Sequence, residues 1–302
     1  MNINLIETYI EANGHGYSND TITSYLTDIR QFLDFGKDLM GVSDDVEVVK
    51  QVEYLHCVKY LTHMRERNLS PFTMNRKLSC LSKFMDFCID LKLTDDNSIR
   101  KIRRFVTTDI EQDNDYLTRD EYLALIETIK STPAARKGDS FIVARDTLLY
   151  TLLLTTGLRI TEARSLKLHQ VDLENKRIRP LRKGRRFQDI DITDELVELY
   201  HNYMNERENI YLDEETEELV FTSVNGNPLS TRDCNRALQK YCARANIKTV
   251  TCHDLRHTCA TNLMRRGANI EDVSNLLGHR SISTTSRYIH GEASHVSKLM
   301  GL

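Results

Sequence analysis

Residues 251–290 read TCHDLRHTCATNLMRRGANIEDVSNLLGHRSISTTSRYIH, and they combine histidines, arginines and a tyrosine with apolar residues at helical spacing. Two glycines in this stretch each follow a periodic apolar run, which predicts two helices that end there. His253, Arg256 and His257 are three and four residues apart, so a helix places all three on one face. Side chains that bind phosphate, grouped with a tyrosine nucleophile, indicate chemistry on a phosphate.

The composition indicates a globular protein of two domains. The chain has 302 residues, of which 40% are hydrophobic, and this length is enough for two separate cores. It contains no run of roughly 18 apolar residues that could span a membrane, and its first residues lack the pattern of a signal peptide, so we expect a cytoplasmic protein. Seven cysteines, without a CxxC pair, predict reduced, buried thiols rather than disulfides.

The distribution of charge is more informative than the net charge of −3, which by itself argues against nucleic-acid binding. Residues 176–186 (KRIRPLRKGRR) carry seven basic side chains and no acid, whereas the charges of residues 205–218 are almost all acidic. One interpretation is a basic face for an anion. The other is that these are ordinary solvated charge runs.

The first part of the chain, residues 1–96, is expected to form a four-helix domain. Polar positions on these helices include Arg76, Lys77 and Lys83, which could follow a phosphate backbone, although exposed basic residues are also usual on soluble helices. Residues 97–115 have few apolar side chains and a basic cluster, and are interpreted as a linker. The predicted helices cover approximately residues 3–13, 20–37, 52–67 and 71–92.

Residues 116–302 are expected to form a mostly helical second domain with one β-hairpin. The pattern T-x-x-E at Thr118 and Glu121 predicts a capping box, and the apolar run FIVARDTLLYTLLLTT predicts a buried core helix that ends at Gly157. The stretch KRIRPLRKGRRFQDIDIT alternates around Gly184 like a hairpin. Further predictions are a helix capped by Asp194, a short strand at LVFTS (219–223) and a helix from STRDCNRALQKYCARANI (230–247).

Two residues outside the 251–290 stretch complete the chemistry. Arg159 lies at the tip of the buried core helix, where an arginine is held rigidly and keeps its charge. Lys183 lies near the hairpin turn and can donate a proton to a leaving oxygen, which the neighbouring arginines do poorly. Tyr288 can attack phosphorus if a base or cations lower its pKa, which is ordinarily near 10.

Five motifs, in order along the chain, together resemble the tyrosine recombinase (phage integrase) family. They are T-G-L-R-I-T-E at 156–162, R-K-G-R at 182–185, H-D-L-R-H at 253–257, L-L-G-H at 276–279 and T-T-S-R-Y at 284–288. The helices of the first domain resemble the core-binding (SAM-like) domain of this family, so the resemblance covers nearly the whole chain. Its size and layout are similar to the two-domain Xer-type recombinases and transposon integrases.

The resemblance implies a metal-free catalytic site with unequal roles for its residues. Arg159 and Arg256 hold the scissile phosphate, with His279 as a further donor, and Glu162 supports the site. Lys183 is the general acid, His253 a general base or phosphate ligand, and Tyr288 the nucleophile that forms a 3′-phosphotyrosine. The implied partner is double-stranded DNA with an inverted-repeat recombination site, bound by a homotetramer, with or without a second recombinase or accessory protein. No cofactor and no membrane contact are implied.

Three other functions fit parts of the sequence. His253 and His257 have the i, i+4 spacing of a zinc site, flanked by Cys252 and Cys259, with His279 as a third ligand. Against a zinc site, Asp254 stands where such a motif carries its glutamate base, and Arg256 would place a fixed positive charge beside the metal. A DNA-binding regulator explains the basic hairpin and leaves Tyr288 without a role. A type IB topoisomerase shares the chemistry, whereas the first domain favours a site-specific recombinase.

Overall fold

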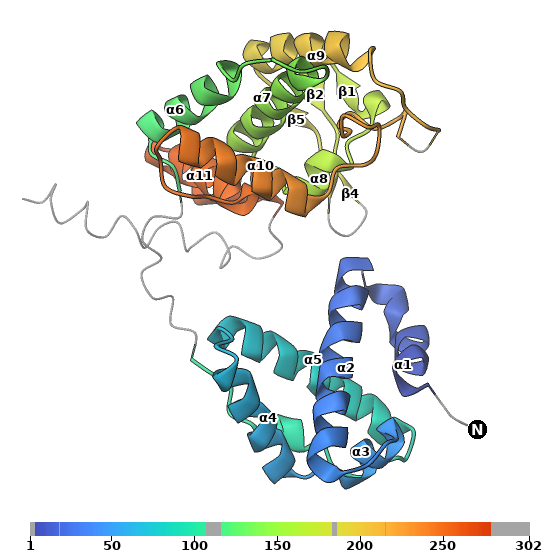
Figure 1. The fold of residues 1–302 in the computed structure, drawn as a ribbon. Coiled ribbons are helices and arrows are strands. Elements are labelled where there is room, and N and C mark those ends of the chain that lie inside the picture. Colours follow the sequence, from blue (N-terminus) through green and yellow to red (C-terminus); the bar gives the residue numbers. More distant parts are fainter. Residues whose placement is uncertain (1–3, 18, 107–115, 183–185, 215, 279–302) are drawn as a thin grey trace, which may run out of the picture. The chain divides into compact units, whose positions relative to one another are not determined.

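The computed structural model describes residues 4–17, 19–106, 116–182, 186–214 and 216–278. It divides into two compact units, residues 1–111 and 112–302, each of which has its own core (Figure 1). Helices dominate both units, and the second adds short antiparallel strands, so the predicted mainly helical fold class is confirmed. Within the described ranges, no helix has the length and apolar character that a membrane crossing needs.

The four helices predicted for the first unit are confirmed. Their starts follow the sequence signals: the Ser70 hydroxyl accepts a hydrogen bond from the Thr73 N–H (3.2 Å), and Pro71 occupies the first turn. One further short α-helix, α3, and two 3₁₀ helices were not predicted. The α-helices of this unit are α1 (Leu5–Asn13), α2 (Asn19–Met40), α3 (Asp45–Gln51), α4 (Tyr54–Glu66) and α5 (Pro71–Asp90), and its 3₁₀ helices are η1 (Gly14–Gly16) and η2 (Ser98–Lys101).

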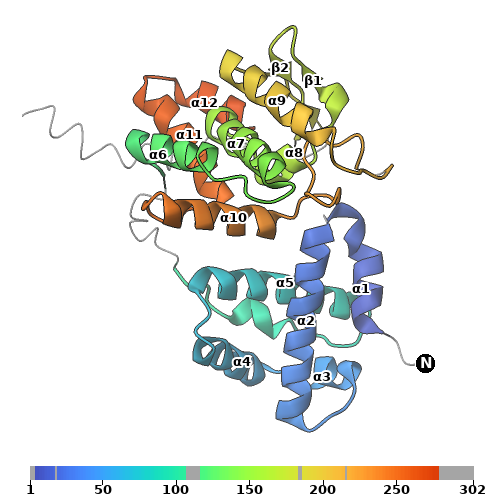
Figure 2. The same cartoon turned by 45° about the horizontal axis from the view of Figure 1, so that its top comes forward.

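Helix α2 crosses α5 (Figure 2). Ion pairs around the buried Asp28 join the two helices. The carboxylate of Asp28, which is 1% exposed, accepts hydrogen bonds from Arg76 (2.6 and 3.1 Å) and from the Lys77 ammonium (2.7 Å). Lys77 is itself only 6% exposed. The expectation that Lys77 belongs to a solvent-facing surface for phosphates is therefore wrong, because its charge neutralises a buried acid.

Part of the predicted linker packs on the first unit. The Asn97 side-chain amide donates hydrogen bonds to the Ser82 carbonyl (2.8 Å) and to Asp86 (2.6 Å), both on α5. Ile99 and Ile102 are buried in the core of this unit. Residues 98–102 therefore extend the helical unit beyond residue 96, while the division into two domains at these exact residues stays a prediction.

The second unit is built around α7, which is buried on nearly all sides. It packs against α6, α9 and α11 (Figure 2). Its Tyr150 hydroxyl donates to the Cys234 carbonyl of α10 (2.8 Å). The nearly continuous apolar sequence of the second half of α7 follows from this position, since all its residues from Asp146 to Thr156 except Thr155 are buried. The α-helices are α6 (Arg119–Lys130), α7 (Asp139–Thr156), α8 (Ile160–Arg164), α9 (Asp194–Arg207), α10 (Thr231–Arg244), α11 (Cys252–Arg265) and α12 (Ile270–Leu277).

The helix ends of this unit follow the sequence signals with one correction. Thr118 and Glu121 form the predicted capping box of α6, and Gly157 ends α7 in the left-handed region with φ 63°. Asp194 is not the cap of α9. The Thr193 hydroxyl takes that role by accepting from the Leu196 N–H (3.3 Å), which leaves Asp194 in the first turn.

The predicted hairpin forms as two short antiparallel ladders. Strand β2 lies between β1 and β5, and farther along the hairpin β3 pairs with β4, with Arg182 opposite Arg186. The predicted strand at 219–223 is reduced in the described chain to isolated bridges of Leu219 with Lys167 and of Thr222 with Pro228. The strands are β1 (Val171–Asp172), β2 (Arg177–Ile178), β3 (Leu181–Arg182), β4 (Arg186–Phe187) and β5 (Ile190–Asp191).

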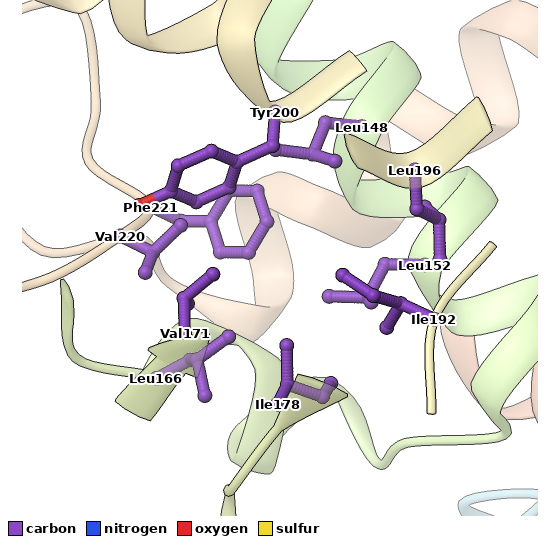
Figure 3. A pocket seen from close by; sticks show the side chains of 10 residues that line it. All are labelled: Leu148, Leu152, Leu166, Val171, Ile178, Ile192, Leu196, Tyr200, Val220 and Phe221. Atoms are coloured by element: carbon purple, nitrogen blue, oxygen red, sulfur yellow. The ribbon is translucent and has the colours of Figure 1, made fainter. Parts of the chain in front are cut away.

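An apolar cavity lies between this sheet and helices α7 and α9 (Figure 3). Its volume is about 280 Å³, including its opening to solvent. Ile178 of β2 and Phe221 face it, and Tyr200 of α9 closes one side. Because the lining is aliphatic and aromatic, the cavity continues the core and offers little to a charged ligand such as a phosphate.

Gly157→Ala is expected to lower the free energy of unfolding by about 2–5 kcal/mol. A left-handed conformation costs a residue with a Cβ roughly 1–2 kcal/mol, and overpacking adds about 1–3 kcal/mol. Both apply here, since φ is 63° and a Cβ would lie 2.5 Å from Leu277 Cδ2. Urea denaturation measures the loss.

Gly267→Ala is the matched control for that measurement. Gly267 also has a positive φ, 86°, but no atom lies within 4 Å of the position of its Cβ. Gly267→Ala should therefore lose only the free energy that the left-handed conformation costs, about 1–2 kcal/mol. Equal losses for the two variants would contradict the packing argument at Gly157.

All seven cysteines of the chain are free and buried, as predicted. Burial raises the pKa of Cys57, Cys80, Cys88 and Cys259 to about 12 and that of Cys234 to about 11. Such thiols stay protonated and unreactive near neutral pH.

Candidate active site

Arg159 projects from the N-terminal end of α8, immediately after the turn that ends α7. Its backbone N–H donates to Glu162 Oε2 (2.9 Å), and its Nη1 donates to Glu162 Oε1 (2.8 Å). The side chain of Arg159 is 31% exposed, whereas that of Glu162 is 5% exposed. The buried carboxylate thus fixes a guanidinium that solvent, or a ligand, can still reach.

A second arginine, Arg182 of β3, binds the same carboxylate. Its Nη1 donates to Glu162 Oε2, its Nε donates to Gln188 Oε1 (3.0 Å), and its Nη2 donates to the Leu276 carbonyl (2.6 Å). Arg182 is 6% exposed. Sequence reasoning missed both Arg182 and Gln188 as parts of this site. The available signal was the position of Arg182 directly before Lys183.

Arg256 of α11 is buried between the ends of two other helices. Its Nη1 donates to the Gly157 carbonyl (2.7 Å) and its Nη2 to the Leu277 carbonyl (2.7 Å). Gly157 is two residues before Arg159, so the segments of Arg256 and Arg159 come together although the two residues are 97 positions apart in the sequence. At 2% exposure, Arg256 is far more buried than a surface arginine.

The three residues that the sequence placed on one helix face differ in their surroundings. His253 is exposed and lies one turn before the buried Arg256, while His257 is partly buried. The His253 and His257 rings contact each other edge to face, with centroids 4.5 Å apart. His253 is therefore accessible at the end of α11 near the buried guanidinium.

The last turn of α12 is anchored through three consecutive carbonyls. The Gln188 amide donates to the Asn275 carbonyl (2.8 Å), and the next two carbonyls accept from Arg182 and Arg256. The positive charges also suit the negative end of the helix dipole. This turn ends at Gly278, whose φ is 65°, so the hairpin and α11 together fix the point from which the chain continues to residue 279.

Three of the six predicted site residues lie outside the described residues: Lys183, His279 and Tyr288. The described chain reaches Arg182, directly before Lys183, and Gly278, directly before His279. The other three, Arg159, His253 and Arg256, belong to segments that the structure brings together. The roles of all six stay predictions.

The described residues of the alternative zinc site, two histidines and two cysteines of α11, do not form a set of metal ligands. Across the described ranges, no group of three or more His, Cys, Asp or Glu side chains is placed to hold a metal ion. Burial raises the pKa of the Cys259 thiol to about 12 and that of Cys252 further, whereas a metal binds the thiolate. Cys259 instead contacts the Thr155 carbonyl at 3.5 Å.

The Glu162 carboxylate is ionised at neutral pH. Burial alone would raise its pKa, but the charge of Arg182 and the hydrogen bonds and charge of Arg159 outweigh burial and lower the pKa below its usual range. A carboxylate with a lowered pKa stabilises the fold above its unfolded-state pKa of about 4.3. That stabilisation disappears as the pH falls through the lower, folded-state pKa.

Glu162→Gln should therefore lower the free energy of unfolding most above about pH 5, and the difference from the wild type should shrink below about pH 4. Urea denaturation at a series of pH values measures it. Glu198→Gln, at an exposed position of α9, is the control for amide substitution. A difference that stays constant down to about pH 3 would contradict an ionised Glu162 in the native state.

Comparison with known proteins decides the family. Residues 115–295 match the phage integrase family, and residues 7–92 match the phage integrase N-terminal SAM-like domain. The chain belongs to the phage integrase family. The resemblance found in the five sequence motifs is confirmed, and the N-terminal helices are those of the SAM-like domain.

Relatives in this family carry the name tyrosine recombinase. XerD of Staphylococcus epidermidis is 29% identical over 286 residues, covering 94% of this chain and 92% of the relative. XerC of Staphylococcus carnosus is 29% identical over 282 residues, covering 91% and 87%. The chain is accordingly a phage-integrase-family enzyme of site-specific DNA recombination, as predicted.

Solved structures of integrases share the fold. The Tn1549 transposon integrase in complex with a circular intermediate DNA has a TM-score of 0.69 at 20% identity, covering 94% of this chain and 93% of that chain. A lambda integrase dimer bound to a COC′ core site has a TM-score of 0.69 at 16% identity, with the same coverage. At these identities the similarity establishes the arrangement of helices and strands only.

Proposed function

We propose that this phage-integrase-family enzyme breaks and rejoins DNA strands through a covalent bond to Tyr288. The Tyr288 oxygen attacks the phosphorus of a phosphodiester, a P–O bond to tyrosine forms, and the bond from phosphorus to the 5′ oxygen breaks. His253 accepts the phenol proton and Lys183 donates a proton to the departing 5′ oxygen. Attack of a 5′ hydroxyl on the phosphotyrosine reverses these steps and joins a new strand.

The observation that carries this proposal is the bond between Arg256 and the Gly157 carbonyl, at 2.7 Å. It joins the segment of Arg256 to the segment of Arg159, and two guanidiniums together suit the two non-bridging oxygens of one phosphate. Charge placed in advance stabilises the transition state without reorganisation. His279, which follows the anchored end of α12, is proposed as a third donor to the phosphate.

We further propose that four protomers act on two duplexes, each with an inverted-repeat site, with or without a second recombinase or accessory protein. The integrase structures determined in complex with DNA support a DNA partner. An inverted repeat has two-fold symmetry, which suits a symmetric assembly of protomers. Since one phosphoester replaces another, the exchange needs no nucleotide or metal cofactor. The DNA substrate and the seven buried free thiols favour the cytoplasm.

Trapping the covalent intermediate tests this function. On a nicked duplex, the short strand released by cleavage diffuses away and the protein stays attached, so a stable adduct should accumulate. Digestion with a protease followed by mass spectrometry should place the nucleotide on Tyr288. An adduct at any other residue, or no adduct on DNA that carries the recombination site of this protein, would overturn the proposal.

Lys183→Ala is expected to slow cleavage of ordinary DNA by roughly 10²–10⁴-fold, the usual contribution of a general acid. A 5′-phosphorothiolate substrate should restore most of the rate, because a thiolate leaves without a proton. Single-turnover cleavage rates on both substrates measure the effect. If the loss is equally large on the phosphorothiolate, Lys183 is not the acid.

A further inference from the structure

One carboxylate, that of Glu162, forms ion pairs with two guanidiniums, those of Arg159 and Arg182. The cluster therefore contains more positive than negative charge. The exposure of the two arginines differs: the Arg182 side chain is 6% exposed and that of Arg159 is 31% exposed. A buried carboxylate needs a buried partner, because its desolvation is otherwise uncompensated. Arg182 meets that need in the interior, and Arg159 stands at the accessible side.

We propose that Arg182 is a positioning residue that neutralises Glu162 and so leaves the charge of Arg159 for a DNA phosphate. The inference rests on the proposed function, in which Arg159 binds the scissile phosphate. Among the described residues, Arg159 would without Arg182 be the sole guanidinium partner of Glu162, and the pair would be neutral. With Arg182, the cluster keeps a net charge of about +1.

The other contacts of Arg182 hold the cluster in place. Its Nε bonds Gln188 at 3.0 Å, and Gln188 in turn bonds the Asn275 carbonyl at 2.8 Å. Its Nη2 bonds the Leu276 carbonyl at 2.6 Å. Arg182 therefore fixes Glu162 against both β4–β5 and the last turn of α12, and a planar guanidinium is the side chain that can serve three such partners at once.

Arg182→Met tests the proposal, since it keeps much of the volume and removes the charge. We expect single-turnover cleavage, at saturating site DNA, to fall by about 10- to 100-fold, below the loss for removing a direct phosphate ligand. Arg186→Met is the matched control. Arg186 lies opposite Arg182 in the same ladder and is exposed, so it removes the same charge from the hairpin without touching Glu162.

A change in the substrate separates positioning from a merely structural role. In a methylphosphonate a methyl group replaces one non-bridging oxygen, so the linkage is neutral and depends less on Arg159. The loss for Arg182→Met should then shrink to about threefold or less, in parallel with the loss for Arg159→Ala. A loss that is equally large on both substrates would overturn the inference.

The double variant Arg182→Met, Glu162→Gln gives a second readout. If Arg182 acts through Glu162, the double variant should cleave about as fast as Glu162→Gln alone, because no carboxylate remains to compete for Arg159. Losses that multiply would overturn the inference. Should Arg182→Met fail to fold, Arg182→Lys keeps the neutralising charge and should lose less than about 10-fold in cleavage rate. A loss for Arg182→Lys as large as that for Arg159→Ala would overturn the inference.

Failure of the inference differs from failure of the proposed function. If Arg159→Ala loses cleavage on the phosphodiester and recovers on the methylphosphonate, Arg159 binds the phosphate as proposed. In that case an unrescued Arg182→Met overturns the inference alone. An Arg159→Ala variant that cleaves ordinary DNA normally overturns both.

Discussion

Tyr288→Phe should bind site DNA with wild-type affinity and form no covalent adduct. The substitution removes one oxygen atom, which in the proposed mechanism is the atom that bonds to phosphorus, and phenylalanine has no group that can replace it. The residue keeps its aromatic ring, so we expect packing and DNA binding to change little. The expected loss of strand cleavage is therefore complete, and larger than that for any other single substitution proposed for this chain.

The measurement combines a gel shift on site DNA with trapping on a nicked duplex. Tyr211→Phe is a suitable control, because Tyr211 is 88% exposed and belongs to no predicted part of the site. An adduct of normal yield from Tyr288→Phe would refute the assignment of the nucleophile. Loss of DNA binding together with cleavage would show instead that the tyrosine is needed for the complex to form.

Arg256→Lys should lower cleavage by roughly 10²–10³-fold, the effect of removing one preorganised donor to a transition state. A lysine keeps the charge, but a single ammonium group lacks the planar fork that reaches the Gly157 and Leu277 carbonyls together, both at 2.7 Å. Leaving one buried carbonyl without its donor costs about 1–3 kcal/mol, so the free energy of unfolding should fall as well.

Single-turnover cleavage and urea denaturation separate the two effects. Arg266→Lys, at an exposed position just after α11, provides the control for the same substitution. If Arg256→Lys loses stability and cleaves at the wild-type rate, Arg256 only joins the helix ends. If it loses cleavage at a temperature where it is fully folded, its guanidinium also acts on the phosphate.

The helical parts of the fold could be predicted because their signals are local. The apolar spacing of α2, the serine and proline at the start of α5, the capping box of α6 and the glycine after α7 each lie within a few residues of the feature they predict. Helix α3 was missed because only Asp44, which caps it, and two buried valines mark its seven residues. A segment this short has too few turns for its period to be recognised.

The chemistry of the site was predictable by resemblance, while its supporting contacts were not. In β3 the usual pattern is inverted, because Leu181 is 41% exposed and Arg182 is 6% exposed. Hydrophobic alternation would instead bury Leu181 and expose Arg182. The reason for the inversion is Glu162, which lies 20 residues earlier in the chain and needs a buried cation. Sequence patterns do not report such distant pairs.

The same limit applies to Lys77 and to the basic run of residues 176–186. Lys77 has the spacing of a surface lysine, yet Asp28, 49 residues away, draws it into the core. In the basic run, Arg177 and Arg179 form ion pairs with Asp191 and Asp189 across the hairpin. Exposed pairs of this kind contribute little to stability, but they reduce the positive charge that the run presents.

The protected state of the thiols makes the wild-type chain directly suitable for site-specific labelling. All seven cysteines are buried, and burial raises the pKa of each above its ordinary value. A maleimide dye reacts with an accessible thiolate, so one cysteine introduced at an exposed position should take up the dye ahead of the native thiols. With one such cysteine in each unit, a donor on the N-terminal helices and an acceptor on the second unit would report the distance between the two units in solution, with and without DNA, by fluorescence energy transfer.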